Sequence, residues 1–157
     1  MDTVQPNEKA KAILDSVRFI TVATVSAQGE PWNTPVTAFR FKGSDALYWA
    51  SWRETQHSQN IRANGRAFIV AFDSTPANGK VGHAVYIEAT ATELTDESEV
   101  LQAALVFEGD KYKMSDGSQY LGEHPLRMYK AVPNKIWING DMHVGGFFVD
   151  VRVEAEA

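Results

Sequence analysis

The fold of this chain follows from the stretch Leu47–Ile61, which reads LYWASWRETQHSQNI. Its aromatic-rich start is typical of a β-strand, and its end predicts a short helix that stops at Asn64-Gly65. Between them lies a polar turn in which hydroxyls, a guanidinium and an imidazole fall within residues 51–57. A strand that leads through such a turn into the start of a helix predicts a cradle for an anion.

Composition limits the classes of function that the chain can have. Its 157 residues suit one domain, 1–157, and 44% apolar with 22% charged residues indicate a globular protein. A net charge of −5 without a basic run argues against nucleic-acid binding, and the absence of cysteine excludes disulfides, thiol catalysis and Cys-ligated metal. Neither a signal peptide nor an apolar run of about 18 residues is visible, so we expect a cytoplasmic protein that does not enter membranes.

Hydrophobic periodicity predicts the remaining elements on both sides of this stretch. A helix is expected over 6–18 and again over 55–64, and another begins at Thr95 with that residue as its N-cap. Strands are expected over 19–26, 31–41, 46–51, 66–74, 84–94, 135–139 and 147–153, with loops at 75–80 and 109–125 and a short helical turn at 127–130.

The order of these elements favours a closed antiparallel sheet. Most consecutive strands are joined by short turns, whereas an open parallel sheet needs a crossover helix between most of its strands. An antiparallel meander of this size closes into a small barrel. The third helix is expected to bury Val100, Leu101, Ala104 and Leu105, and the long 109–125 segment is interpreted as a lid.

Three groups of residues, in this order and spacing, resemble the pyridoxamine 5′-phosphate oxidase-like family of flavin-binding split barrels. They are Gly29-Glu30-Pro31 with Pro35-Val36, then Leu47-Tyr48, Ser51, His57 and Asn60-Ile61, then Tyr129, Val132-Pro133 and Ile136-Trp137. The resemblance covers about residues 10–153. It implies a mainly β fold, an antiparallel split β-barrel with flanking helices, and a homodimer that holds FMN in a cleft between its subunits.

The resemblance also implies which residues contact the cofactor. Thr34, Pro35, Val36 and Thr37 would lie along the isoalloxazine ring and offer backbone groups to its polar edge. Ser51, Arg53, Thr55, Gln56 and His57 would surround the phosphate, Trp52 would flank the flavin or the dimer seam, and Trp137 would approach the flavin of the partner.

The chain departs from the family pattern at the residues that would bind the FMN phosphate and at those that would bind the substrate. A lysine is common at the place of His57, a further basic residue occurs at the place of Gln56, and the oxidases proper have an arginine at the place of Thr34. A protonated His57 would compensate, because a phosphate favours that protonation. In the pyridoxamine phosphate oxidases, an Arg–Leu–His run binds the phosphate of the substrate. In this chain only His143 matches that run, and its arginine has no counterpart. We therefore predict that the chain does not oxidise pyridoxamine phosphate.

Simpler interpretations stand beside these assignments. His57 is alternatively a solvated helix histidine, Arg53 an ion-pair partner of Glu54 or another acid, and Trp49 a core residue. The other histidines lack metal-ligand spacing, so no metal site is predicted. A Ser–His–Asp triad of Ser74, His57 and Asp73 is rejected because no nucleophile elbow is visible.

The leading functional hypothesis is an FMN-dependent oxidoreductase, similar to flavin reductases, with a small-molecule substrate or NAD(P)H as electron donor. Catalytic residues are not assigned, because the flavin itself carries the redox chemistry. The alternatives are a non-catalytic flavin- or haem-binding module and a deazaflavin-dependent reductase.

Overall fold

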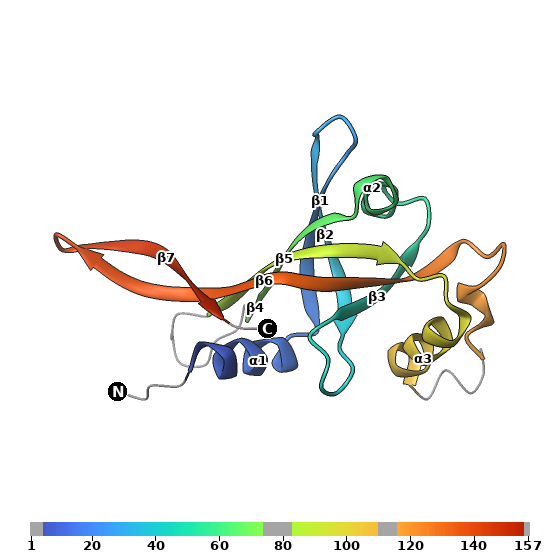
Figure 1. Ribbon diagram of the computed structural model, residues 1–157, viewed down its shortest axis with the longest axis horizontal. Helices are drawn as coiled ribbons and strands as arrows, with labels where there is room; N and C mark the ends of the chain where they lie inside the picture. The colour runs from blue at the N-terminus through green and yellow to red at the C-terminus, as the bar shows by residue number, and fades with distance from the viewer. Residues whose placement is uncertain (1–4, 74–82, 110–115, 156–157) are drawn as a thin grey trace.

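Seven antiparallel strands form the molecule's single sheet in a computed structural model that describes residues 5–73, 83–109 and 116–155 (Figure 1). The strand order is β3-β2-β1-β4-β5-β6-β7, and β3 pairs with β6 as well. This additional pairing closes β1 to β6 into a six-stranded barrel and leaves β7 outside it. The predicted antiparallel split barrel with flanking helices is confirmed.

The elements follow the predicted order. They are α1 (Pro6–Ser16), β1 (Phe19–Val25), β2 (Pro31–Phe39), β3 (Leu47–Trp52), α2 (Gln56–Asn64), β4 (Arg66–Phe72), β5 (Ala84–Glu93), α3 (Glu97–Glu108), the 3-10 turn η3 (Ser118–Tyr120), β6 (Leu126–Val144) and β7 (Phe147–Ala155). The 75–80 loop and residues 110–115 of the expected lid lie outside the described residues.

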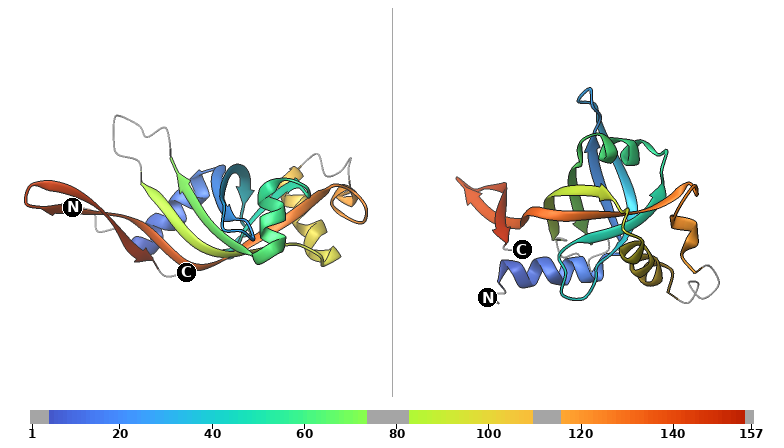
Figure 2. Two further views of the ribbon diagram at one scale, coloured as in Figure 1. Left: turned by 90° about the horizontal axis from the view of Figure 1, so that it is seen from above. Right: turned by 45° about the vertical axis from the view of Figure 1, so that its right-hand side comes forward.

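Alternation along the strands fills the barrel. Inward side chains such as Val22, Ile69 and Ile87 are fully buried, and Trp49 is buried among them as predicted. Ala10 and Leu14 of α1 join the same core as Ile61 of α2. The two helices lie at opposite ends of the barrel (Figure 2).

A second, smaller core lies between α3 and the outside of β3 and β6. Val100, Ala103 and Ala104 of the helix pack against Tyr48 and Met128. The predicted stripe is therefore partly wrong: Ala103 is buried instead of Leu105, which is 51% exposed, and Leu101 is only half-buried. The helix is apolar on most sides, so its periodicity does not determine which side faces the barrel.

Two local predictions about helices are wrong. The N-cap of α3 is Asp96 and not Thr95, because the Asp96 carboxylate accepts a hydrogen bond of 2.8 Å from the Glu99 backbone N–H. Residues 127–130 are not a helical turn but the start of β6, where they pair with β3. The end of α2 at Gly65 is confirmed, with a left-handed φ of 68°.

The hairpin of β6 and β7 extends beyond the barrel as an arm (Figure 1). Val144 pairs with Phe147, so Gly145 and Gly146 form a two-residue turn, and their φ angles of 57° and 83° suit the turn type that such hairpins favour. The side chain of Phe147 is 76% exposed at its tip. No helix in the described ranges is long and apolar enough to cross a membrane.

Candidate functional site

The residues of the predicted anion cradle come together where β3 ends and α2 begins. The Ser51 and Thr55 hydroxyl oxygens lie 3.4 Å apart, and the Thr55 hydroxyl lies 2.8 Å from the Ser58 hydroxyl. The Thr55 side chain also bonds the Trp52 carbonyl oxygen at 2.9 Å, which closes the turn. We call Ser51, Thr55 and the first turn of α2 the cradle.

The start of α2 keeps its donors available. Thr55 is the N-cap residue, but its side chain makes no capping hydrogen bond to the helix backbone. The first-turn N–H groups of a helix have no partner inside the helix and carry its positive end. The cradle therefore combines hydroxyls with backbone donors, which is the composition of an anion site at a helix N-terminus.

His57 lies in the first turn of α2 but is turned away from solvent. Its side chain is only 3% exposed, its Nε2 lies 3.5 Å from the Thr55 hydroxyl, and its ring is tilted against Tyr129 at 6.4 Å. The solvated alternative for this histidine is wrong. Burial lowers its pKa below the ordinary 6.5, so the imidazole is neutral at pH 7 and brings no charge to the cradle.

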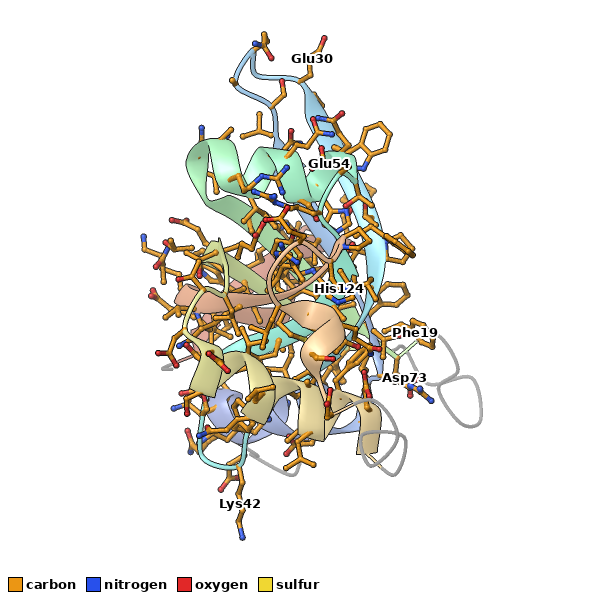
Figure 3. The ribbon with its side chains drawn as sticks, turned by 90° about the vertical axis from the view of Figure 1, so that its right-hand side faces the viewer. Phe19, Glu30, Lys42, Glu54, Asp73 and His124 are labelled. Atoms are coloured by element: carbon orange, nitrogen blue, oxygen red, sulfur yellow. The ribbon has the colours of Figure 1, made fainter. Side chains whose placement is uncertain are left out.

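Positive charge comes instead from an arginine cluster behind the cradle, formed by Arg53, Arg62 and Arg127. All three approach the carboxylate of Glu93, at 3.7 Å from Arg53 Nε, 3.2 Å from Arg62 Nη1 and 3.2 Å from Arg127 Nε. Glu54, whose side chain is 77% exposed beside α2 (Figure 3), approaches Arg62 at 3.7 Å. Three guanidinium groups thus face two carboxylates, of which one is solvated, and the cluster keeps an excess of positive charge.

Arg62 and Arg127 were missed by the sequence analysis. Arg127 pairs across the strands with Ser51 of the cradle, and it is buried, with 8% exposure. It donates to the carbonyl oxygens of His124, Leu126 and, at 2.5 Å, Gly122, so it also anchors the turn before β6. The assignment of residues 127–130 to a helical turn concealed this pairing.

The barrel is split beside the cradle, between β2 and β3. These strands pair only at Ala38 with Trp49 and at Phe39 with Tyr48, whereas β2 pairs with β1 from Pro31 to Thr37. Continuing the β2–β3 register would put Val36 opposite Ser51, so the 34–37 segment and the cradle form the two sides of the split. In the described part of the chain, that segment has no strand partner on its β3 side, which leaves backbone groups available to a ligand.

Side chains on the β2 side of the split alternate. Val36 points into the core, Pro35 is exposed, and Thr37 is half-buried. The Thr34 hydroxyl accepts a 2.9 Å hydrogen bond from the Trp32 indole N–H. Pro35 also borders a hollow of about 490 Å³ on the outside of the barrel. Among the described residues, no group of three or more His, Cys, Asp or Glu side chains could hold a metal ion.

Comparison with known proteins identifies the family of this split barrel. A family model described as pyridoxamine 5′-phosphate oxidase matches residues 6–138. The chain belongs to the pyridoxamine 5′-phosphate oxidase family. No curated protein matches its sequence. The resemblance that the sequence motifs indicated is therefore confirmed at the level of the family.

Solved structures with the same fold bind different cofactors. The haem storage protein HutZ of Vibrio cholerae has a TM-score of 0.67 at 15% identity, covering 85% of this chain and 94% of that one. A FAD-binding protein of Mesorhizobium loti has a TM-score of 0.65 at 16% identity, covering 83% and 91%. A haem-binding protein of Mycobacterium smegmatis has a TM-score of 0.69 at 20% identity, covering 96% of this chain and 59% of that one. At these identities the likeness shows the fold alone.

The remaining site residues expected for a member of this family fall in two places. Trp52, which is 57% exposed, and Gln56, whose amide bonds Asn60 at 2.9 Å, lie at the cradle. Trp137 does not: it lies eleven residues beyond Leu126, the partner of Trp52, which is roughly 36 Å along β6. Within one chain Trp137 stacks on Phe68, with ring centres 6.4 Å apart.

Proposed function

We propose that the chain binds FMN at the split between β2 and β3 and acts as an FMN-dependent oxidoreductase that accepts electrons from NAD(P)H. The observation that carries this proposal is the juxtaposition of the 34–37 backbone with the cradle across the split. A flavin needs both parts, because its ring has a polar edge that takes backbone hydrogen bonds and its tail ends in a phosphate.

The residues present fit the phosphate. The hydroxyls of Ser51 and Thr55 and the free amides of α2 offer hydrogen bonds, while the arginine cluster offers charge from behind. Neutral His57 can contribute one N–H donor but no charge. Bound FMN would supply hydride or electron transfer, and this chain's residues would bind it, orient it and set the field around it.

We also propose that the functional form is a homodimer with the cofactor at the subunit interface. Phe19 and Phe72 are 63% and 47% exposed on the outside of neighbouring strands β1 and β4, and both line the hollow that borders Pro35. The exposed arm and the distance of Trp137 from the cradle support the same arrangement. A second copy would cover these apolar surfaces and would bring Trp137 to the flavin of its partner.

The test begins with the visible absorption spectrum of the purified protein and with titrations of FMN, FAD, riboflavin and haem. We expect one FMN per chain and weaker binding of riboflavin, which lacks the phosphate. Saturable flavin reduction by NADH or NADPH is expected to follow. No binding of FMN would contradict the cofactor, and bound FMN that neither nucleotide reduces would contradict the enzyme.

The competing outcomes are informative in themselves. A haem spectrum with no flavin binding would favour a haem-binding module. Turnover of pyridoxamine phosphate would contradict the substrate prediction made from the missing Arg–Leu–His run, without affecting the FMN site.

A further inference from the structure

Two side chains of α2 hold the backbone of the turn that leads into the cradle. The Arg53 carbonyl oxygen accepts a hydrogen bond of 2.6 Å from Arg62 Nη1. The Glu54 carbonyl oxygen accepts one of 2.8 Å from Gln59 Nε2. Both donors lie beyond the first turn of the helix, so the helix that offers its free N–H groups also fixes the turn in front of them.

The orientation of these peptide groups decides whether the turn attracts or repels an anion. A trans peptide points its C=O and the following N–H in opposite directions. Because the Arg53 carbonyl is directed at Arg62, the Glu54 N–H points the other way, and it makes no hydrogen bond to the described part of the chain. If this peptide turned over, a carbonyl oxygen would replace the N–H, and its dipole would repel a phosphate instead of binding it.

The two side chains differ in charge, which allows their roles to be separated. Gln59 is neutral and exposed, so it can act on the turn through its hydrogen bond alone. Arg62 combines two roles, because its Nη1 group also donates to the Glu93 carboxylate at 3.2 Å. The planar guanidinium serves both acceptors at once, which a single lysine ammonium on a flexible stem does less well.

We propose that Gln59 and Arg62 are positioning residues that make the cradle selective for an anion. They hold the turn so that its N–H groups, and not its carbonyl oxygens, are available to the ligand. The inference rests on the proposed flavin site and adds to it the residues that distinguish FMN from riboflavin. Neither side chain is assigned a contact with the phosphate.

FMN and riboflavin are the probes, each titrated with protein while the flavin fluorescence is followed. Gln59→Met keeps the length of the side chain but removes its donor. It should raise the Kd of FMN about threefold or more, since loss of one neutral hydrogen bond corresponds to a change of about two- to tenfold. The Kd of riboflavin should stay unchanged. Arg62→Lys keeps the charge and loses the fork, and it should weaken FMN binding by at least a similar factor.

Gln102→Met is the matched control, because Gln102 is another exposed helical glutamine and lies on α3. It should leave both affinities unchanged. Since Gln59 is exposed, Gln59→Met should also keep the wild-type thermal unfolding curve.

Equal FMN binding by Gln59→Met and wild type would overturn the proposal, and so would equal losses of FMN and riboflavin affinity in that variant. Full FMN binding by Arg62→Lys would show that Arg62 acts through its charge alone and would overturn its positioning role. Failure of the wild type to bind FMN is a different result, because it would overturn the proposed flavin site and this inference with it.

Discussion

At the scale of single residues, buried His57 makes stability depend on pH. Its pKa is lowered in the folded chain but is about 6.5 when unfolded, so above pH 6.5 both states are neutral and the stability is fully present. As the pH falls from 6.5 towards the lowered folded value, only the unfolded state gains the proton. We predict that the free energy of unfolding falls over this window by at most about 1.4 kcal/mol per pH unit.

Urea unfolding of His57→Gln between pH 5 and 8 checks this prediction. The variant should lose the acid-dependent slope, whatever its stability at pH 8. His124→Gln is the control, because His124 is exposed and should leave the slope as in wild type. An unchanged slope in His57→Gln would place the acid sensitivity elsewhere.

We expect Glu93 to stabilise the fold and to oppose anion binding at the cradle, and these two effects can be separated. Replacing it with Gln removes the carboxylate that three arginines approach, so we predict a loss of roughly 2–3 kcal/mol in stability. The same change leaves more positive charge behind the cradle and should strengthen FMN binding several-fold, with riboflavin unaffected.

Glu54→Gln is the matched control for Glu93, since its side chain is 77% exposed. The free energy of unfolding of Glu54→Gln should differ from that of wild type by less than about 0.5 kcal/mol. Chemical unfolding and calorimetric titration of both flavins provide the measurements. Weaker FMN binding by folded Glu93→Gln would show that the cluster acts on the cradle through geometry instead of charge.

At the scale of elements, the sequence predicts what local patterns encode. Alternating strands such as β5 and the Gly65 helix end follow from residue type alone, and so does the cradle at Ser51 and Thr55. What it cannot show is pairing between distant segments. Arg127 belongs to the site because β6 pairs with β3, and short apolar runs do not distinguish a strand from a helical turn.

The orientation of α3 gives a prediction at the same scale. Ala103 is fully buried while Leu105 is 51% exposed, the reverse of what the predicted stripe implied. Ala103→Gln should therefore cost about 1–3 kcal/mol by overfilling a packed core with a polar side chain. Leu105→Gln should stay within about 0.5 kcal/mol of wild type. Thermal unfolding of the two variants measures both changes in stability. Equal losses of stability at the two positions would contradict this orientation of α3.

At the scale of the whole molecule, one barrel would present the two halves of the proposed flavin site on different surfaces. The cradle and the 34–37 segment lie along the split, whereas Trp137 and exposed Phe19 and Phe72 lie on the outside of the sheet. A stable interface of standard size needs about 800 Å² from each partner. Surface for such an interface is available on the exposed outer rings, in the hollow beside Pro35 and on the projecting arm. The proposed dimer would bring the two halves of the flavin site together.

This arrangement predicts that FMN affinity depends on dimerisation. Phe72→Ser should raise the dimer dissociation constant about tenfold or more, because a buried phenylalanine contributes roughly 1.5–3 kcal/mol. Leu105→Ser is the matched control: Leu105 is similarly exposed, but it lies on α3, away from β4 (Figure 2). Sedimentation and FMN titration at several protein concentrations should show FMN binding falling with the dimer fraction in Phe72→Ser alone. A wild-type monomer that binds FMN fully would instead place the entire cofactor site within one barrel, and Trp137 would then have no part in it.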